Sequence, residues 1–244
     1  MATLPALTLT LTNAAYAVSG KAILSDLTLT LTEPQIGIIG RNGSGKTTLL
    51  RLLAGLIAPT SGTVRLGTLD PAADRKPLLT QLGILFQNPD HQILFPTVGE
   101  ELAFGLIQMG QPEPQARTAV RTLLAQESRA HWETAAIHTL SQGQRHYLCL
   151  LAVLLMNPAI ILLDEPFAGL DLPTQARLKR RLADLPQQII TISHDPAAMA
   201  DYDRVIWIDE GRVKADGPAQ TVLTAFTAEM AWIGVQDADT DLPV

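Results

Sequence analysis

The sequence of 244 residues has very little cysteine and no long apolar run. Its single cysteine, Cys149, excludes a framework of internal disulfides and is typical of a reducing compartment. Because Cys149 lies within an apolar helical pattern, we expect a buried structural thiol. The longest apolar stretch, 147–156, is far shorter than the roughly 20 residues that a membrane-spanning helix needs. The sequence therefore does not predict a membrane-spanning protein.

Basic residues are also scarce. The 18 Lys and Arg against 24 Asp and Glu give a net charge of −6, so we expect no nucleic-acid partner. The first residues, Met1 to Leu11, lack the basic start of a signal peptide, and no repeat, low-complexity tract or long linker interrupts the chain. With 47% hydrophobic residues, the composition is that of a globular protein with a substantial core.

Short apolar strands alternate with helices along the chain. Strands are expected at 7–12, 27–31, 35–39, 82–86, 159–163, 188–192 and 204–208. Helices are expected at 47–56, at 97–126 with a break near 110–114, at 141–156 and at 173–183. The basic side chains of the last helix, at 177 and 179–181, are expected to be solvated. The sequence predicts an α/β fold in which a helical insertion at about 88–155 interrupts a parallel core sheet.

The segment Gly40–Thr47 carries the pattern G-x-x-x-x-G-K-[ST] between an expected strand and an expected helix. Its glycines let successive backbone N–H groups turn toward phosphate oxygens, and the helix N-terminus adds partial positive charge. Lys46 is a charge for the β- and γ-phosphates, and the Thr47 hydroxyl is a ligand for Mg²⁺. The pattern predicts a nucleoside-triphosphate site made by Gly40, Asn42, Gly43, Ser44, Gly45, Lys46, Thr47 and Thr48.

Two carboxylates, Asp164 and Glu165, end the expected strand 159–163. A strand buried on both faces delivers them to its carboxyl end, where ligands of open α/β sheets bind. Asp164 is suited to the Mg²⁺ shell, and Glu165 is placed to orient or deprotonate an attacking water. Together with the phosphate loop, this pair predicts hydrolysis of a nucleoside triphosphate.

Just upstream lies Leu140-Ser-Gln-Gly-Gln144, and here the sequence resembles the ATP-binding-cassette (ABC) ATPases, whose signature is usually written L-S-G-G-Q. The resemblance covers about residues 5–226 and includes the family's order of motifs, from Tyr16 through the phosphate loop, Gln87, the signature, Asp164-Glu165 and Ala168–Asp171 to His194. It implies a P-loop NTPase of the ABC type with a small antiparallel β subdomain. A single nucleotide-binding domain would span 1–230, followed by a short tail at 231–244 whose acidic end, 236–244, is expected to fray.

The resemblance also implies roles for the matched residues, with ATP and Mg²⁺ as the bound species. Tyr16 would stack on adenine, and Gln87 would touch both the Mg²⁺ shell and the attacking water. His194 would contact the γ-phosphate beside the catalytic Glu165. Ser141, Gly143 and Gln144 would serve the ATP held by another subunit, with Asp171 at the seam. Gln142 replaces the first signature glycine, but because Ser141 and Gly143 remain, we expect activity to survive.

One phosphate loop and one signature per chain imply that two chains meet head to tail to complete two ATP sites. A homodimer of ATPase subunits is sufficient, and pairing with a related second ATPase stays open. The remaining histidines, at positions 91, 131, 138 and 146, lack the spacing of metal ligands and are expected to be surface or satisfied polar residues.

Phe86–Gly105 narrows the resemblance to the ATPases of energy-coupling-factor (ECF) importers, which usually show F-Q-N-P-D-x-Q followed by P-T-V-x-x-E/D-x-A-F-G. The stretch 140–155 is most similar to the ATPase subunits of biotin importers, although cobalt and nickel importers use similar ATPases. The resemblance implies a peripheral ATPase at the cytoplasmic face of the cell membrane, bound to a transmembrane scaffold subunit and a small membrane solute-binding subunit.

The helical insertion is the part expected to dock the membrane partner. Its apolar residues Ile93, Leu94, Phe95 and Phe104 would line a groove for a helix of that partner, or would simply pack the insertion. Two other functions stay open: the ATPase of an exporter or lipid transporter, and a soluble ABC ATPase acting on DNA, RNA or ribosomes. Only the Phe86–Gly105 pattern argues against the first, and the absence of long coiled-coil insertions, zinc motifs and a second cassette argues against the second.

Overall fold

The computed structural model describes residues 7–235, so the expected fraying of 236–244 lies outside the described residues. Its core is a six-stranded sheet in the order β5-β6-β7-β3-β8-β9. These strands are β3 (Gln35–Ile39), β5 (Leu82–Leu85), β6 (Ile160–Asp164), β7 (Gln188–Ser193), β8 (Arg204–Asp209) and β9 (Arg212–Pro218). All neighbouring pairs are parallel except β8 and β9. Every residue of β6 is buried, as expected for a strand covered on both faces.

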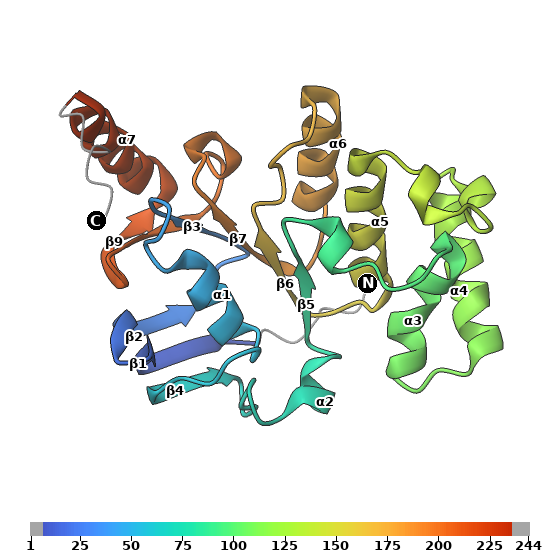
Figure 1. Cartoon of the computed structure of the whole chain (residues 1–244), viewed down its shortest axis with the longest axis horizontal. Helices are drawn as coiled ribbons and strands as arrows, with labels where there is room; N and C mark the ends of the chain where they lie inside the picture. The colour runs from blue at the N-terminus through green and yellow to red at the C-terminus, as the bar shows by residue number, and fades with distance from the viewer. Residues whose placement is uncertain (1–6, 236–244) are drawn as a thin grey trace.

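A second, smaller sheet is antiparallel and has the order β2-β1-β4. It consists of β1 (Leu9–Val18), β2 (Lys21–Leu31) and β4 (Ser61–Leu66), and it lies beneath helix α1 (Lys46–Leu53) in Figure 1. Ser19 and Gly20, both with positive φ, form the tight turn between β1 and β2. Because both strands continue up to this turn, they are longer than the sequence predicts. The expected fold, a parallel core sheet with a small antiparallel subdomain, is confirmed.

Helix α1 and three further helices pack around the core sheet. Helix α1 contacts β2 on one side and β6 and β7 on the other, so it lies between the two sheets (Figure 1). Helices α5 (Gln142–Leu155) and α6 (Leu172–Ala183) stand side by side, joined through one buried apolar cluster. Helix α7 (Ala219–Val235) packs on β8 and β9 and continues past residue 230, so residues 231–235, expected in the tail, are helical.

The helical insertion has its own apolar core. It contains α3 (Val98–Gln108) and α4 (Glu113–Gln126), which are separated near Gly110 as expected, and it is flanked by the short helix α2 (Arg75–Leu78). Within the described residues, the insertion also contains the 3-10 turns η1 (Pro89–His91), η2 (Ala130–Trp132) and η3 (Ile137–Thr139). Another such turn, η4 (Pro196–Ala198), follows β7 outside the insertion. Helix α5 belongs to both cores, because Leu148 and Leu151 pack on the insertion while Cys149 and Leu150 pack on the sheet side.

The single cysteine behaves as the sequence predicts. Cys149 is 1% exposed, and burial raises the pKa of its thiol to about 12. A thiol with that pKa is almost entirely protonated at neutral pH and is a poor nucleophile. Cys149 is therefore a packing residue of α5.

Candidate functional site

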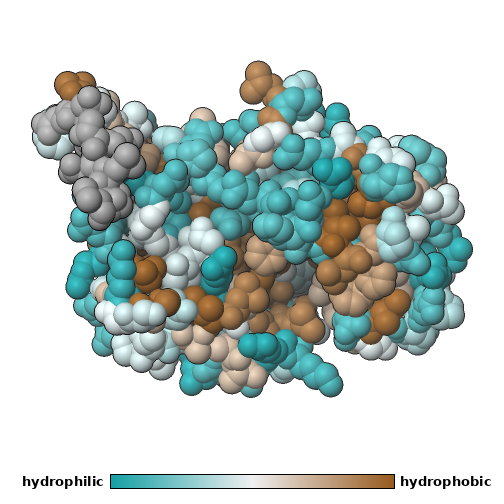
Figure 2. All heavy atoms as spheres, in the orientation of Figure 1, coloured by the Kyte–Doolittle hydropathy of each residue, from teal (hydrophilic) through white to brown (hydrophobic). Residues whose placement is uncertain are grey.

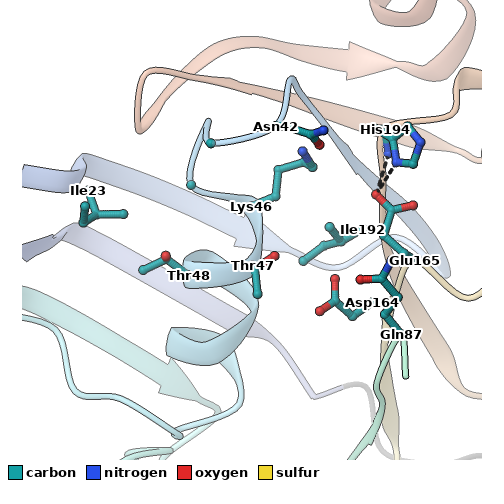
Figure 3. Close-up of a pocket in the computed structure, with 12 residues that line it drawn as sticks. Ile23, Asn42, Lys46, Thr47, Thr48, Gln87, Asp164, Glu165, Ile192 and His194 are labelled. Atoms are coloured by element: carbon teal, nitrogen blue, oxygen red, sulfur yellow. Dashed lines mark hydrogen bonds and ion pairs between the residues drawn. The ribbon is translucent and has the colours of Figure 1, made fainter. Parts of the chain in front are cut away.

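The phosphate-loop residues meet the ends of three core strands around a pocket of about 460 Å³ (Figure 3). The loop follows β3 and opens α1, while Asp164 and Glu165 follow β6 and His194 follows β7. The parallel order places all these strand ends at one edge of the sheet. The pocket is lined by Ile23, Asn42, Gly43, Gly45, Lys46, Thr47, Thr48, Gln87, Asp164, Glu165, Ile192 and His194.

Lys46 lies at the centre of the loop. Its Nζ donates to the backbone oxygens of Gly40 at 2.7 Å and Arg41 at 2.8 Å, and the residue is 7% exposed. Burial lowers the pKa of Lys46, while the negative charges of Glu165 and Asp164 act in the opposite direction. The ammonium group is thus held by two carbonyls in a pocket with an acidic far side, from which it can turn to phosphate oxygens.

The loop also leaves a buried donor without a partner. The Ser44 hydroxyl is buried, and no described residue forms a hydrogen bond with it. Gly40 is packed so closely that a Cβ there would lie 2.2 Å from the backbone oxygen of Ile208 and 2.6 Å from Ser44 Oγ. An unpaired buried hydroxyl is costly, so a loop with one suits an occupant that supplies acceptor oxygens, as a phosphate does.

Asp164 is suited to bind a cation. It is 8% exposed, and burial raises the pKa of its carboxyl, helped by the charge of Glu165 and opposed by Arg51 and Lys46. Over residues 7–235 there is no cluster of three or more Asp, Glu, His or Cys residues able to hold a metal ion. Mg²⁺ commonly takes one or two carboxylates and completes its shell with waters and substrate phosphates. Asp164, with Thr47 and Gln87 lining the same pocket, fits that pattern.

Glu165 is held by the end of β7. Its Oε1 accepts from the backbone N–H of His194 at 2.9 Å and lies 2.7 Å from His194 Nδ1, as the dashed lines in Figure 3 show. Its Oε2 accepts from the Ser193 hydroxyl at 2.8 Å. Glu165 has a φ of +47°, an unusual value for a residue other than glycine that turns its side chain toward β7. Sequence reasoning predicted Glu165 and His194 but missed Ser193, whose only signal was its place directly before His194.

Tyr16, which was expected to stack on adenine, does not line the pocket. It lies on β1 opposite Leu24, is half-buried, and packs against the core cluster. Ile23, which the sequence analysis did not select, lines the pocket in its place. Stacking of Tyr16 on adenine stays a prediction.

The signature residues lie outside this pocket, at the start of α5. Ser141 caps the helix by accepting from the backbone N–H of Gln144 at 3.3 Å, and Gln144 Oε1 accepts from the Ser141 N–H at 2.8 Å. This reciprocal pair is a capping box. Gly143 lies close to α6, because a Cβ on it would lie 3.2 Å from Thr174 Cγ2. Ser141 and Gln144 are exposed and separate from the phosphate pocket of their own chain.

Asp171 caps the neighbouring helix. Its Oδ1 accepts from the backbone N–H of Thr174 at 2.9 Å, and the hydrogen bonds with Thr174 lower the pKa of the exposed Asp171 carboxyl. The N-termini of α5 and α6 thus lie together, joined by the contact of Gly143 with Thr174. Their place outside the phosphate pocket is the arrangement that head-to-tail pairing of two chains requires.

One histidine differs from the sequence expectation. Those at 91, 131 and 138 are exposed, but His146 is 2% exposed and its Nε2 has no hydrogen-bond partner among the described residues. Burial lowers the pKa of His146, and a hydrogen bond to the Pro166 backbone opposes that effect. His146 is buried because α5 is covered on both sides, by the insertion and by the loop after Glu165.

An apolar patch lies on the insertion between η1 and α3. Leu94 is 66% exposed, and the rings of Phe95 and Phe104 pack with centroids 5.1 Å apart. The buried Glu101 fixes this loop, because its Oε2 accepts from the backbone N–H groups of Leu94 at 2.8 Å and Phe95 at 3.0 Å. Figure 2 shows apolar atoms gathered over this part of the molecule. Ile93, the fourth expected groove residue, instead packs against both apolar clusters.

Comparison with known proteins places the chain among transport ATPases. Residues 24–168 match the family model described as ABC transporter. The biotin transport ATP-binding protein BioM of Rhodobacter capsulatus is 49% identical over 211 residues, which cover 86% of this chain and 90% of that protein. BioM of Rhizobium etli is 38% identical over 214 residues, covering 88% of this chain and 95% of that one.

A solved structure shows the same fold. The structure of cbiO1 from Clostridium perfringens, described as part of the ABC transporter complex cbiONQ, superposes with a TM-score of 0.75 at 29% identity, covering 94% of this chain and 95% of that one. The dimeric ABC cassette MJ0796, bound to ADP and Pi, has a TM-score of 0.72 at 24% identity and covers 86% of this chain and 98% of that one, a likeness of fold alone. Between residues 7 and 235, no helix has the length and apolarity needed to cross a membrane.

Proposed function

This chain belongs to the ABC transporter family as an ATP-hydrolysing subunit of an importer of the ECF type, and we propose that the solute it helps to import is biotin. The observation that carries this proposal is the 49% identity to BioM of Rhodobacter capsulatus over nine-tenths of that protein. A cobalt or nickel importer is the second candidate, because the ATPases of such importers are similar to those of biotin importers over the Phe86–Gly105 pattern.

In the proposed mechanism, the phosphate loop holds ATP through its N–H groups, Lys46 and Ser44. Lys46 turns from the carbonyls of Gly40 and Arg41 to the β- and γ-phosphates. Asp164, Thr47 and Gln87 would hold Mg²⁺, which supplies positive charge to the phosphate oxygens. Glu165, oriented by the Ser193 hydroxyl and His194, accepts a proton from the water that attacks the γ-phosphorus.

The second half of each site comes from another ATPase subunit. Ser141 and Gln144 are exposed on the chain that carries them, so they are available to the γ-phosphate held by a second copy in a head-to-tail dimer. ATP binding would draw the two chains together, and hydrolysis would release them. A homodimer is the simplest assembly, because each chain carries one complete set of motifs.

The apolar patch on the insertion is the proposed contact with the membrane. Leu94, Phe95 and Phe104 would receive a helix of the transmembrane scaffold subunit, so closure of the ATPase dimer would move that subunit. A small membrane solute-binding subunit would complete the transporter. The chain itself would then lie peripherally at the cytoplasmic face of the cell membrane.

Purification of the chain from its native membrane in mild detergent, with mass spectrometry of the proteins recovered, tests the proposal. We expect a helical scaffold protein and a small, very hydrophobic protein. The recovered complex, placed in vesicles with ATP at the ATPase side, should take up labelled biotin, and uptake should stop with Glu165→Gln. Uptake of Co²⁺ or Ni²⁺ without biotin would favour the second candidate, and recovery of soluble partners alone would overturn the importer.

A further inference from the structure

Two side chains of α5 reach the segment that follows Glu165. Gln142 and His146 are four residues apart and therefore lie on the same face of the helix. Gln142 Nε2 lies only 3.2 Å from the place where a Cβ on Gly169 would be, and Gly169 has a φ of +71°, which favours glycine. One turn further along, the buried His146 forms its hydrogen bond with the Pro166 backbone.

That segment, 166–171, is also held by α6, and Glu165 directly before it is held by the end of β7. Gln175 Nε2 donates to the backbone oxygens of Phe167 at 3.2 Å and Leu170 at 2.9 Å. At the other end, Glu165 is held by Ser193 and His194. Because this segment follows Glu165 directly, the positions of Pro166 and Gly169 bear on the backbone that carries the Glu165 carboxylate.

We propose that Gln142 and His146 are positioning residues that couple the two ATP sites of the dimer through each subunit. The inference rests on the proposed head-to-tail assembly. In that assembly, the start of α5 contacts the γ-phosphate bound by the second copy, while Glu165 acts on the ATP of its own chain. Movement of α5 toward the second copy's γ-phosphate therefore reaches Glu165 through Gln142 and His146.

Gln142 is the residue at which this chain departs from the usual family signature. The usual signature has glycine at this position, and glycine has no side chain that could touch Gly169. The amide of Gln142 supplies that contact, and the missing Cβ of Gly169 makes room for it. The same substitution that departs from the family pattern thus joins the signature helix to the catalytic segment.

The test is ATP hydrolysis by the assembled transporter as a function of ATP concentration. We expect Gln142→Ala to lower the Hill coefficient toward unity and to lower kcat by about 5-fold or more, the size of a typical coupling between sites. The affinity of the ATPase subunit for a non-hydrolysable ATP analogue should not change, because Gln142 lies outside the phosphate pocket. Gln115→Ala, which truncates an exposed glutamine on α4, is the matched control and should behave as the unmodified protein does.

His146 provides a second, independent variant. His146→Gln keeps a hydrogen-bond donor toward Pro166 and should retain more cooperativity than His146→Ala. Wild-type Hill coefficients and kcat in both Gln142→Ala and His146→Ala would overturn the inference, as would a loss of nucleotide affinity in Gln142→Ala. A wild-type transporter that hydrolyses ATP without cooperativity would overturn the coupling alone, whereas one that hydrolyses no ATP would overturn the proposed function.

Discussion

The N-termini of α1 and α5 carry the phosphate loop and the signature, and they differ in how their backbone N–H groups are satisfied. Helix α1 begins at Gly45, whose φ is +104° and which has no side chain to cap the helix. Helix α5 begins at Ser141, where the capping box with Gln144 satisfies donors from within the chain. The first terminus therefore has N–H donors available to a phosphate of its own chain. At the second terminus, the N–H groups of Ser141 and Gln144 are already satisfied within the chain.

The surroundings of the two termini differ in the same way. The α1 terminus faces Asp164 and Glu165 across a pocket with an unpaired Ser44 hydroxyl. The α5 terminus is exposed, and the described part of the chain places no phosphate site before it. Each chain therefore holds one nucleotide site and, at a separate place, the signature that would complete the site of a second chain, so binding and turnover should respond to different substitutions.

Lys46→Ala is expected to have the largest effect on nucleotide binding. Removing the ammonium group removes the charged donor from the centre of the loop, so nucleotide affinity should fall by about 10- to 100-fold or more, in line with hydrogen bonds to charged groups. Equilibrium titration with a fluorescent ATP analogue measures it. Lys76→Ala, on the exposed face of α2, is the control and should bind normally. Wild-type affinity in Lys46→Ala would contradict the phosphate-loop assignment.

Glu165→Gln separates binding from turnover within the α1 site. The amide keeps the shape of the carboxylate but cannot accept the proton of the water, so turnover should fall by on the order of 100-fold or more. Nucleotide binding should be retained, and ATP should trap a closed dimer. Phosphate release and size-exclusion chromatography with light scattering measure the two outcomes, and unchanged turnover would remove Glu165 from the role of base.

Ser141→Ala tests the α5 terminus. It removes the cap and the hydroxyl offered to the second chain's ATP, so turnover should fall about tenfold while nucleotide affinity stays unchanged. Loss of an N-cap also costs about 1 kcal/mol of stability. Thr97→Ala provides a matched control, since Thr97 caps α3 in the same way by accepting from the Glu100 N–H. The two variants should lose similar stability, but only Ser141→Ala should lose turnover; equal turnover in both would contradict the assignment.

Of the four variants, Asp164→Asn is expected to have the smallest effect. It should raise the stability of the nucleotide-free chain, whereas Ser141→Ala should lower it. Because burial raises the pKa of Asp164, the folded chain binds this proton more tightly than the unfolded chain does. Its stabilising contribution is present at low pH and is lost as the pH rises through the raised pKa. The Tm of nucleotide-free Asp164→Asn should therefore exceed that of the wild type at neutral pH, and by less as the pH falls.

Calorimetry without Mg²⁺, carried out from neutral to acidic pH, checks that expectation. Asp184→Asn, at an exposed carboxylate, is the control and should leave the Tm unchanged. A lower Tm for Asp164→Asn at neutral pH would show that the Asp164 charge stabilises the nucleotide-free fold.

Local patterns were predictable because they need only neighbouring residues. The phosphate loop, the helices α3 to α6 and the core strands other than β9 followed from spacing, and the apolar rows of these elements are buried as expected. Strand β9 and helix α7 gave no such signal. Every residue of β9 is at most half-buried, and α7 buries residues only in its first half while Trp232 and Val235 stay exposed.

The basic face of α6 shows the limit of local reasoning. It was expected to be solvated, but Arg181 donates to Glu127 Oε1 at 2.9 Å, and Glu127 Oε2 accepts from Tyr147 O–H at 2.5 Å. Lys179 donates to the backbone oxygen of Ala197 at 2.9 Å. These contacts join α6 to the insertion, to α5 and to η4 across long distances in the sequence, so spacing along one helix could not show them.

The family, the parallel sheet and the nucleotide-binding loop could be predicted from the sequence, because their motifs, strand patterns and helix patterns are each recognised from neighbouring residues along the chain. How the separate segments meet is seen only in the folded chain, where Ser193 contacts Glu165, Gln142 lies against Gly169, and Ile23 lines the pocket that Tyr16 was expected to line. The physical reason is that such contacts depend on which strand ends share one edge of the sheet and which helix faces are covered. Strand order and packing, and not the spacing of residues along the chain, set both.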